Sequence, residues 1–170
     1  MRSSLIFIFI LLLFSGCKYS TPASIDTVTI KARVNQVMDK WHDDVAKADF
    51  DAYFDAMTED AVFIGTDASE NWSKKEFMAF AKPFFQKKKT WVFKPLKRNV
   101  FVGKDGKVVW FDELLDTWMN ICRGSGVLVK KGETWKIKHY VLSVTIPNDS
   151  MNRVVGIKAL SDSLFINKMR

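Results

Sequence analysis

The chain has few of the residues from which metal centres and disulfide frameworks are built. Its 170 residues include two cysteines, Cys17 and Cys122, and two histidines, His42 and His139. His42 stands beside the acidic pair 43–44, but consecutive helical residues point in different directions and metal ligands must converge. The sequence contains no glycine-rich phosphate loop and no serine-nucleophile motif. We therefore expect neither a metal site nor a bound cofactor.

The longest apolar run, Leu5 to Phe14, is too short for a stable membrane-spanning helix. Ten residues make about 15 Å of helix, half of a roughly 30 Å hydrocarbon core. The run follows Arg2 and precedes Ser15-Gly16-Cys17, which is the layout of a secretory signal. Small residues before a cysteine at this place resemble a bacterial lipobox. Residues 1–16 are therefore predicted to be a lipoprotein signal peptide, and Cys17 the lipidated residue.

The residues that follow Cys17 are consistent with a lipid anchor. Residues 17–26 are polar and contain Pro22, as is typical of a flexible tether. If Cys17 is acylated, Cys122 has no partner and an intrachain disulfide is excluded. The alternative is ordinary cleavage nearby, which leaves Cys17 as a free thiol. Lipidation predicts a protein of the bacterial cell envelope, facing the periplasm, on either the inner or the outer membrane.

Acidic residues are missing from one long stretch of the chain. The formal net charge is +7, and no Asp or Glu lies between Glu76 and Asp105. The same stretch holds eight basic residues, which are Lys82, Lys87, Lys88, Lys89, Lys94, Lys97, Arg98 and Lys104. The pattern predicts either a solvated face or an electropositive patch. Export from the cytoplasm favours anionic lipid headgroups over nucleic acid as the partner of such a patch.

Apolar spacing predicts helices first and strands afterwards. Helical spacing covers residues 27–48 and, after a cap at Asp49, residues 50–57, and a capping box at 73–76 begins a third helix. A short strand is expected at 61–64, and most of 91–146 reads as strands with a hairpin turn at Asp105-Gly106. Helical spacing returns after residue 150. The order predicts an α+β domain over 27–150 with a mainly antiparallel sheet, and a C-terminal helical extension over 151–170.

Strand alternation predicts which side chains face the interior. On the last strand the lysines of residues 136–138 should face water, which turns His139 inward and Tyr140 outward. The same rule applied to Lys130 turns Arg123 inward. A buried polar group without a partner costs about 1 to 3 kcal/mol, so both inward groups need a partner on a neighbouring strand.

Several segments, roughly within residues 30–149, match motifs of one known family: Trp41 with Asp49-Phe50, residues 60–67, 72–77, 110–115 and 123–128, and Trp135 to Ser143. In these motifs and in the order of its elements, the chain resembles the nuclear transport factor two-like superfamily, in its SnoaL-like branch. The resemblance implies a cone-shaped domain in which three N-terminal helices pack on a curved, mainly antiparallel sheet around a deep apolar pocket. It implies function only broadly, because the superfamily includes ketosteroid isomerases, polyketide cyclases, dehydratases and transport factors.

Three titratable residues are the candidate catalytic group. Asp112, Glu113 and His139 lie on strands that we expect to be adjacent, with Arg123 in support. A carboxylate and an imidazole in an apolar cavity can have pKa values near neutrality, as proton abstraction beside a carbonyl requires. The alternative is a structural ion pair of Glu113 with Arg123. A specific ketosteroid isomerase activity is not indicated, because we find no counterpart of the Tyr and protonated Asp that hold the oxyanion in those enzymes.

Aromatic residues supply the candidate ligand site. Trp41, Phe63, Trp72 and Phe111, with Arg123, are the predicted ligand-binding residues, although aromatic side chains at such spacing are more often plain core. The leading interpretation is a lipid-anchored domain that binds a small apolar molecule. The first alternative is an isomerase, cyclase or dehydratase acting on a small apolar carbonyl compound. The second is a homodimeric interaction module that uses an outer sheet face containing residues 140 and 142.

Overall fold

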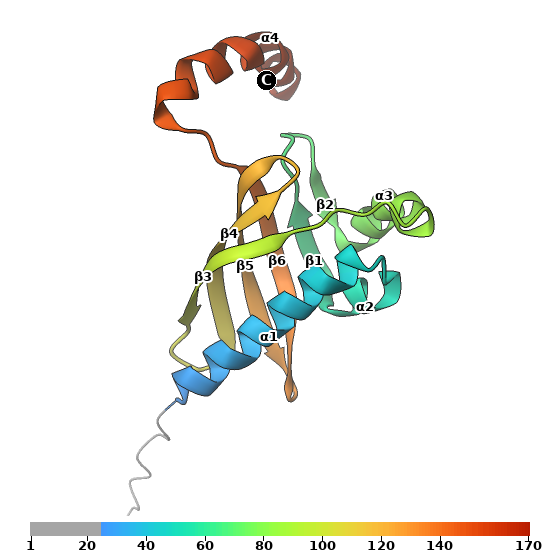
Figure 1. Ribbon diagram of the computed structural model, residues 1–170, viewed down its shortest axis with the longest axis vertical. Coiled ribbons are helices and arrows are strands. Elements are labelled where there is room, and N and C mark those ends of the chain that lie inside the picture. Colours follow the sequence, from blue (N-terminus) through green and yellow to red (C-terminus); the bar gives the residue numbers. More distant parts are fainter. Residues whose placement is uncertain (1–24) are drawn as a thin grey trace, which may run out of the picture.

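The computed structural model describes residues 25–170, and the predicted signal peptide and Cys17 lie outside the described residues. Three helices precede the main strands, and a fourth ends the chain (Figure 1). The helices are α1 (Thr27–Ala46), α2 (Phe50–Asp55), α3 (Lys74–Gln86) and α4 (Met151–Met169), with a short 3₁₀ helix, η1 (Asn148–Ser150). The strands are β1 (Met57–Ile64), β2 (Asn71–Ser73), β3 (Lys94–Val102), β4 (Val108–Thr117), β5 (Asn120–Lys131) and β6 (Thr134–Val144).

The six strands form one curved sheet in the order β2-β1-β6-β5-β4-β3. Strands β1 and β6 pair in parallel, and every other neighbouring pair is antiparallel. Helix α1 crosses the concave face, where it contacts β3 and β6 (Figure 1). The predicted α+β class, with helices on a mainly antiparallel sheet and a C-terminal helix, is confirmed.

Capping residues set the helix starts where the sequence predicted them. Asp49 accepts a hydrogen bond from the Ala52 amide at 3.1 Å and begins α2. Ser73 and Glu76 form the predicted capping box, in which each side chain accepts from the backbone of the other residue. One boundary was wrong, since α2 ends at Asp55 and β1 begins at Met57 rather than at residue 61. The apolar residues of this segment can be buried from a strand as well as from a helix, so their spacing did not fix the boundary.

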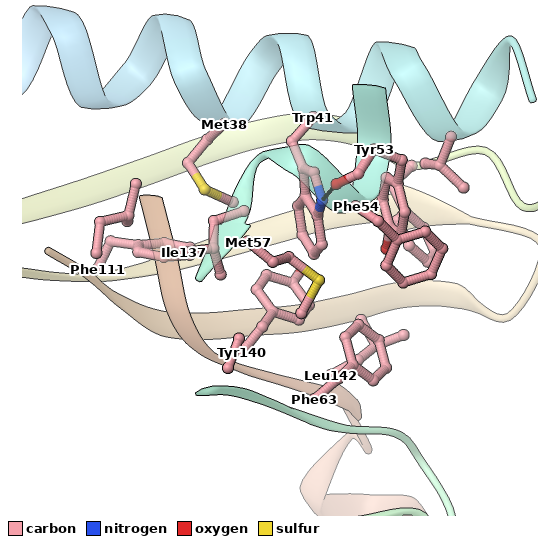
Figure 2. Packing of buried hydrophobic residues seen from close by; sticks show 14 of the residues in the cluster. Met38, Trp41, Tyr53, Phe54, Met57, Phe63, Phe111, Ile137, Tyr140 and Leu142 are labelled. Carbon is pink, nitrogen blue, oxygen red and sulfur yellow. Dashed lines mark hydrogen bonds between the residues drawn. The ribbon is translucent and has the colours of Figure 1, made fainter. Parts of the chain in front are cut away.

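The concave face of the sheet is filled by side chains. Helix α1 buries Val34, Met38, Trp41 and Val45, the spacing of three and four that places residues on one face of a helix. Figure 2 shows Trp41 reaching from α1 toward Tyr53 and Tyr140, and its indole ring stacks on the Tyr53 ring at 4.8 Å. The deep apolar pocket implied by the resemblance is thus largely occupied by the protein's own core.

A bulge in β6 reverses the side-chain alternation of the last strand. Strand β5 pairs Val127 with His139 and Leu128 with Ile137, so Lys138 is an extra residue on β6. An extra residue shifts the following side chains to the opposite face. Ile137 and Tyr140 are both fully buried as a result, while His139 is only partly buried.

The C-terminal helix α4 stands apart from the sheet (Figure 1). None of its residues is buried, and Ile157 and Leu160 are 79% and 75% exposed. Within residues 25–170, no helix combines the length and the apolar character needed to cross a membrane.

Candidate functional site

A buried carboxylate is bound by three side chains beneath α1. Glu113 on β4 is fully buried, and we call it, with the three residues that bind it, the Glu113 cluster. His42 of α1 lies with Nε2 2.8 Å from Oε1, and the Tyr140 hydroxyl of β6 donates to the same oxygen at 3.1 Å. Arg98 of β3 donates from Nε to Oε2 at 2.8 Å. Four separate elements therefore meet at one carboxyl group.

The absence of a side chain at Gly124 makes room for this arrangement. Gly124 on β5 is the register partner of Glu113. A Cβ atom at this position would lie 2.3 Å from the Tyr140 hydroxyl oxygen and 2.9 Å from Oε1 of Glu113. Both separations are shorter than van der Waals contact allows, so any other residue here would displace the Tyr140 hydrogen bond.

Electrostatics keep the Glu113 carboxyl ionised. Burial by itself raises the pKa of Glu113, but the hydrogen bond from His42 and the charges of His42 and Arg98 outweigh it and hold the pKa below its ordinary value. Burial, reinforced by the Glu113 charge, raises the pKa of Tyr140 well above its ordinary value. Tyr140 therefore remains a hydroxyl donor and Glu113 an acceptor. A carboxylate in this state is a weak base, because protonating it would break bonds to His42 and Arg98.

Further contacts tie Arg98 to α1. Its Nη1 donates to the Asp39 carboxylate at 2.8 Å and to the side-chain oxygen of Asn35 at 3.2 Å. Two buried nitrogens of the Glu113 cluster, Nδ1 of His42 and Nη2 of Arg98, have no hydrogen-bond partner among residues 25–170. The cluster thus joins α1 to three strands through charge-assisted bonds, which are about twice as strong as neutral ones.

An apolar cavity of about 150 Å³ opens beside α3, at the end of the sheet nearest the β1–β2 loop. Its wall contains a run of stacked rings, in which Phe77 lies 3.9 Å from Phe63 and 5.7 Å from Trp72, measured between ring centroids. Thr66 and Glu70 supply polar groups to the lining. The remaining lining residues are Gly65, Phe80, Trp91, Phe93, Trp118, Met119 and Leu142.

Aromatic side chains separate this cavity from the Glu113 cluster. Phe93 lines the cavity and meets the His42 ring edge-on, with ring centroids 5.8 Å apart. Phe63 lines the cavity as well, and its ring stacks on that of Tyr140 at 5.6 Å. The buried charge and the cavity are therefore neighbours that share walls, and a molecule in the cavity would meet rings rather than the carboxylate.

Two of the predicted ligand-binding residues line the cavity, and three do not. Phe63 and Trp72 are part of the wall. Trp41 and Phe111 are buried core residues outside the lining, 1% and 3% exposed. The Arg123 side chain is 52% exposed and lies 3.8 Å from the Asp112 carboxylate. Its predicted inward orientation is wrong.

The predicted catalytic group is divided between the two faces of the sheet. Glu113 faces the interior, whereas Asp112 is partly exposed and accepts a hydrogen bond from Asn99 at 3.0 Å. The inward orientation predicted for His139 and the outward one predicted for Tyr140 are wrong because of the bulge at Lys138. Arg123 was misplaced for another reason. Lys130 lies at the end of β5, beyond the core, so it is exposed whichever face of the strand it occupies. Its exposure was therefore no guide to the orientation of Arg123.

Sequence reasoning missed His42 and Arg98, although both carry a readable signal. His42 lies four residues after Met38 and three before Val45, which places it on the buried face of α1. Arg98 lies two residues before the buried Val100 and shares its face of β3. His42 was overlooked because it adjoins the acidic pair 43–44, and Arg98 was overlooked because it lies in the lysine-rich stretch. Within residues 25–170 no three His, Cys, Asp or Glu residues are grouped as a metal site would require.

Comparisons with known proteins agree on the fold. An NTF2-like (nuclear-transport-factor-two-like) protein of unknown function from Pseudomonas putida is 15% identical, with 75% of this chain and 94% of that chain covered and a TM-score of 0.60. A dehydratase candidate of the NTF2-like family from Streptomyces avermitilis is 10% identical, with coverage of 71% and 99% and a TM-score of 0.61.

A ketosteroid isomerase candidate from Shewanella frigidimarina is 12% identical, with 67% of this chain and 97% of that chain covered and a TM-score of 0.55. No curated protein sequence matches. Identities this low establish the shared fold and leave the chemistry open. The profile of the SnoaL-like domain matches residues 34–147, and the chain therefore belongs to the SnoaL-like family of NTF2-like proteins.

Proposed function

We propose that this protein is a lipid-anchored binding domain that holds a small, largely apolar molecule in its aromatic cavity. The observation that carries the proposal is the cavity itself, which is open and lined mainly by aromatic rings. Apolar surface that stays exposed to water raises the free energy of the unliganded protein, and an apolar ligand relieves that cost. The anchor is the acylated Cys17 expected from the sequence.

The size of the cavity limits the ligand. An engineered apolar cavity of about 150 Å³ in another protein binds benzene. The cavity here has the same volume, about 150 Å³, so it can enclose about one six-membered ring of a ligand. Glu70 and Thr66 stand among the lining residues and would favour a ligand with one polar end. A single-ring compound with one hydroxyl, such as phenol, has this chemistry.

The Glu113 cluster favours binding over acid–base catalysis. A general base must reach its substrate and accept a proton. Glu113 is fully buried, three donors occupy its two oxygens, and its pKa is lowered. The cluster therefore has the features of a structural ion-pair network that holds α1 on the sheet, and the proposed function includes no catalysis.

Ligand binding is tested on the intact protein, extracted from bacterial membranes with detergent. Native mass spectrometry detects a co-purifying small molecule, and titration with phenol is followed by tryptophan fluorescence, because Trp72 and Trp91 line the cavity. Met119→Trp should fill the cavity and abolish the phenol response. Asn71→Trp, exposed on β2 and outside the lining, is the matched control. Equal phenol responses in the two variants would refute binding in the cavity.

Anchoring is tested separately by intact mass. Acyl chains on Cys17 should add their mass to a chain that begins at residue 17, and Cys17→Ala should remove both the added mass and the membrane association. A mature chain without acyl mass would refute the anchor and leave the binding proposal in place.

A further inference from the structure

Basic residues are grouped at the end of the domain where the tether enters. Three segments meet there: residues 25–33 at the start of α1, the β3–β4 turn at 103–107 and the β5–β6 turn at 130–134. A Cβ on Gly106 would lie 3.1 Å from Ile25, and the Lys130 amide donates to the Lys107 carbonyl at 2.8 Å. We call these three segments the tether end.

The tether end is basic. It contains six basic residues, Lys31, Arg33, Lys104, Lys107, Lys130 and Lys131, all exposed, and three acidic ones, Asp26, Asp105 and Glu133. Two of the acidic side chains are partly engaged by backbone, since Asp26 caps α1 and Asp105 accepts from the Lys107 amide. The net charge of this end is therefore +3.

The loops at the opposite end of the sheet are acidic, whereas residues 151–170 beyond them, helix α4 and its C-cap, carry Arg153, Lys158, Lys168 and Arg170 against one acidic residue, Asp162. The loops 65–70, 117–120 and 145–150, of which the first two contribute to the cavity lining, contain Asp67, Glu70 and Asp149 and no basic residue. Figure 1 places the start of α1 and helix α4 at opposite ends of the molecule. An anionic surface would therefore attract the tether end more than the cavity end, where the basic residues of α4 offset the acidic loops.

Exposed apolar side chains accompany the lysines of the tether end. Phe101 and Trp110, on the strands that the β3–β4 turn connects, are 44% and 48% exposed, and their rings stack at 5.9 Å. Val28 in the first turn of α1 is 78% exposed. Tryptophan and lysine side chains together are typical of protein surfaces that lie at a membrane–water interface.

We propose that the tether end rests on a bilayer surface rich in anionic lipid, with the cavity opening away from the membrane. This inference rests on the proposed lipid anchor, since the tether enters the domain at Ile25, beside the β3–β4 turn. A basic patch serves as the second attachment signal of a singly acylated protein, and beside several acyl chains it would act mainly by orienting the domain on the surface. Each lysine near an anionic membrane raises the partitioning of the tether end onto the membrane surface by roughly fivefold. Three charge reversals should therefore lower it by at least roughly a hundredfold.

The test uses the full lipidated protein, reconstituted on vesicles of phosphatidylcholine alone or mixed with phosphatidylglycerol. Quenching of tryptophan by brominated lipids is compared between the wild type and Trp110→Phe, so the difference reports Trp110. We expect Trp110 to be quenched on the mixed vesicles only. K104E/K107E/K131E should abolish that quenching, and K82E/K87E/K89E, an equal charge change on and after α3, should preserve it.

Other outcomes overturn the proposal. Equal quenching on both kinds of vesicle, no quenching, or equal losses in the two triple variants would refute a charge-directed orientation. Loss with R153E/K158E/K168E alone would place the membrane contact on α4. Trp110 shielded in a dimer, detected by light scattering, would assign this face to a second copy.

The inference can fail separately from the anchor. If intact mass shows no acyl chains, the same variants are compared for sedimentation with the mixed vesicles. Binding by the wild type that K104E/K107E/K131E loses and K82E/K87E/K89E keeps would still support a basic membrane-facing surface. Absence of sedimentation by the wild type would overturn it.

Discussion

Replacing Gly124 by alanine should destabilise the protein through Tyr140. The new Cβ would lie 2.3 Å from the Tyr140 hydroxyl oxygen, so the hydroxyl must move and its bond to Glu113 is lost. Overpacking costs about 1 to 3 kcal/mol, and a lost hydrogen bond to a charged group about 1.5 to 3 kcal/mol. Gly124→Ala should therefore lower the free energy of unfolding by about 3 to 5 kcal/mol, measured by urea denaturation with circular dichroism.

A double-mutant cycle tests the reasoning. Tyr140→Phe removes the hydroxyl at a cost of about 1.5 to 3 kcal/mol. In that background Gly124→Ala should cost only about 1 to 2 kcal/mol, because the contact with Glu113 remains while the clash with the hydroxyl is gone. Gly156→Ala, where a Cβ meets no atom within 4 Å, is the control and should be unaffected by Tyr140→Phe. Costs that add to within about 0.5 kcal/mol would refute the proposed coupling.

Other consequences are testable on the same protein. Glu113 has a lowered folded-state pKa, so its stabilisation is present above the ordinary pKa of 4.5 and is lost as the pH falls through the folded value; Glu113→Gln should remove this acid slope in urea titrations. Trp118→Ala at the 81% exposed rim should weaken phenol binding in fluorescence titrations and change unfolding stability by less than about 0.5 kcal/mol. Deleting residues 151–170 should leave the calorimetric Tm nearly unchanged, because α4 buries no residue.

The elements of the fold were largely predictable, because local chemistry determines them. The capping box at Ser73 and the turn at Asp105-Gly106 depend on neighbouring residues only, and both are present. Gly106 has a φ of +66°, a value that glycine adopts without strain. Such features depend little on the rest of the molecule, so a single sequence is enough to predict them.

The candidate site was only partly predictable, because it depends on register. One extra residue, Lys138, places Tyr140 in the core and removes His139 from it, and nothing in the local sequence announces a bulge. Glu113 was identified as a candidate, but its partners His42 and Arg98 come from elements 71 and 15 residues away in sequence. To recognise these partners, one would have to know which faces of α1, β3 and β4 point into the interior.

The parallel pairing of β1 with β6 has a consequence for the time at which the domain can fold. Met57 pairs with Ile137, so β1 has no partner on that side until nearly the whole domain has left the ribosome. The entropy cost of closing this loop must be met before the pairing can form, and folds dominated by distant contacts form slowly. The growing chain is thus expected to stay open until its last strand is available, and the export that we propose would require such an unfolded chain.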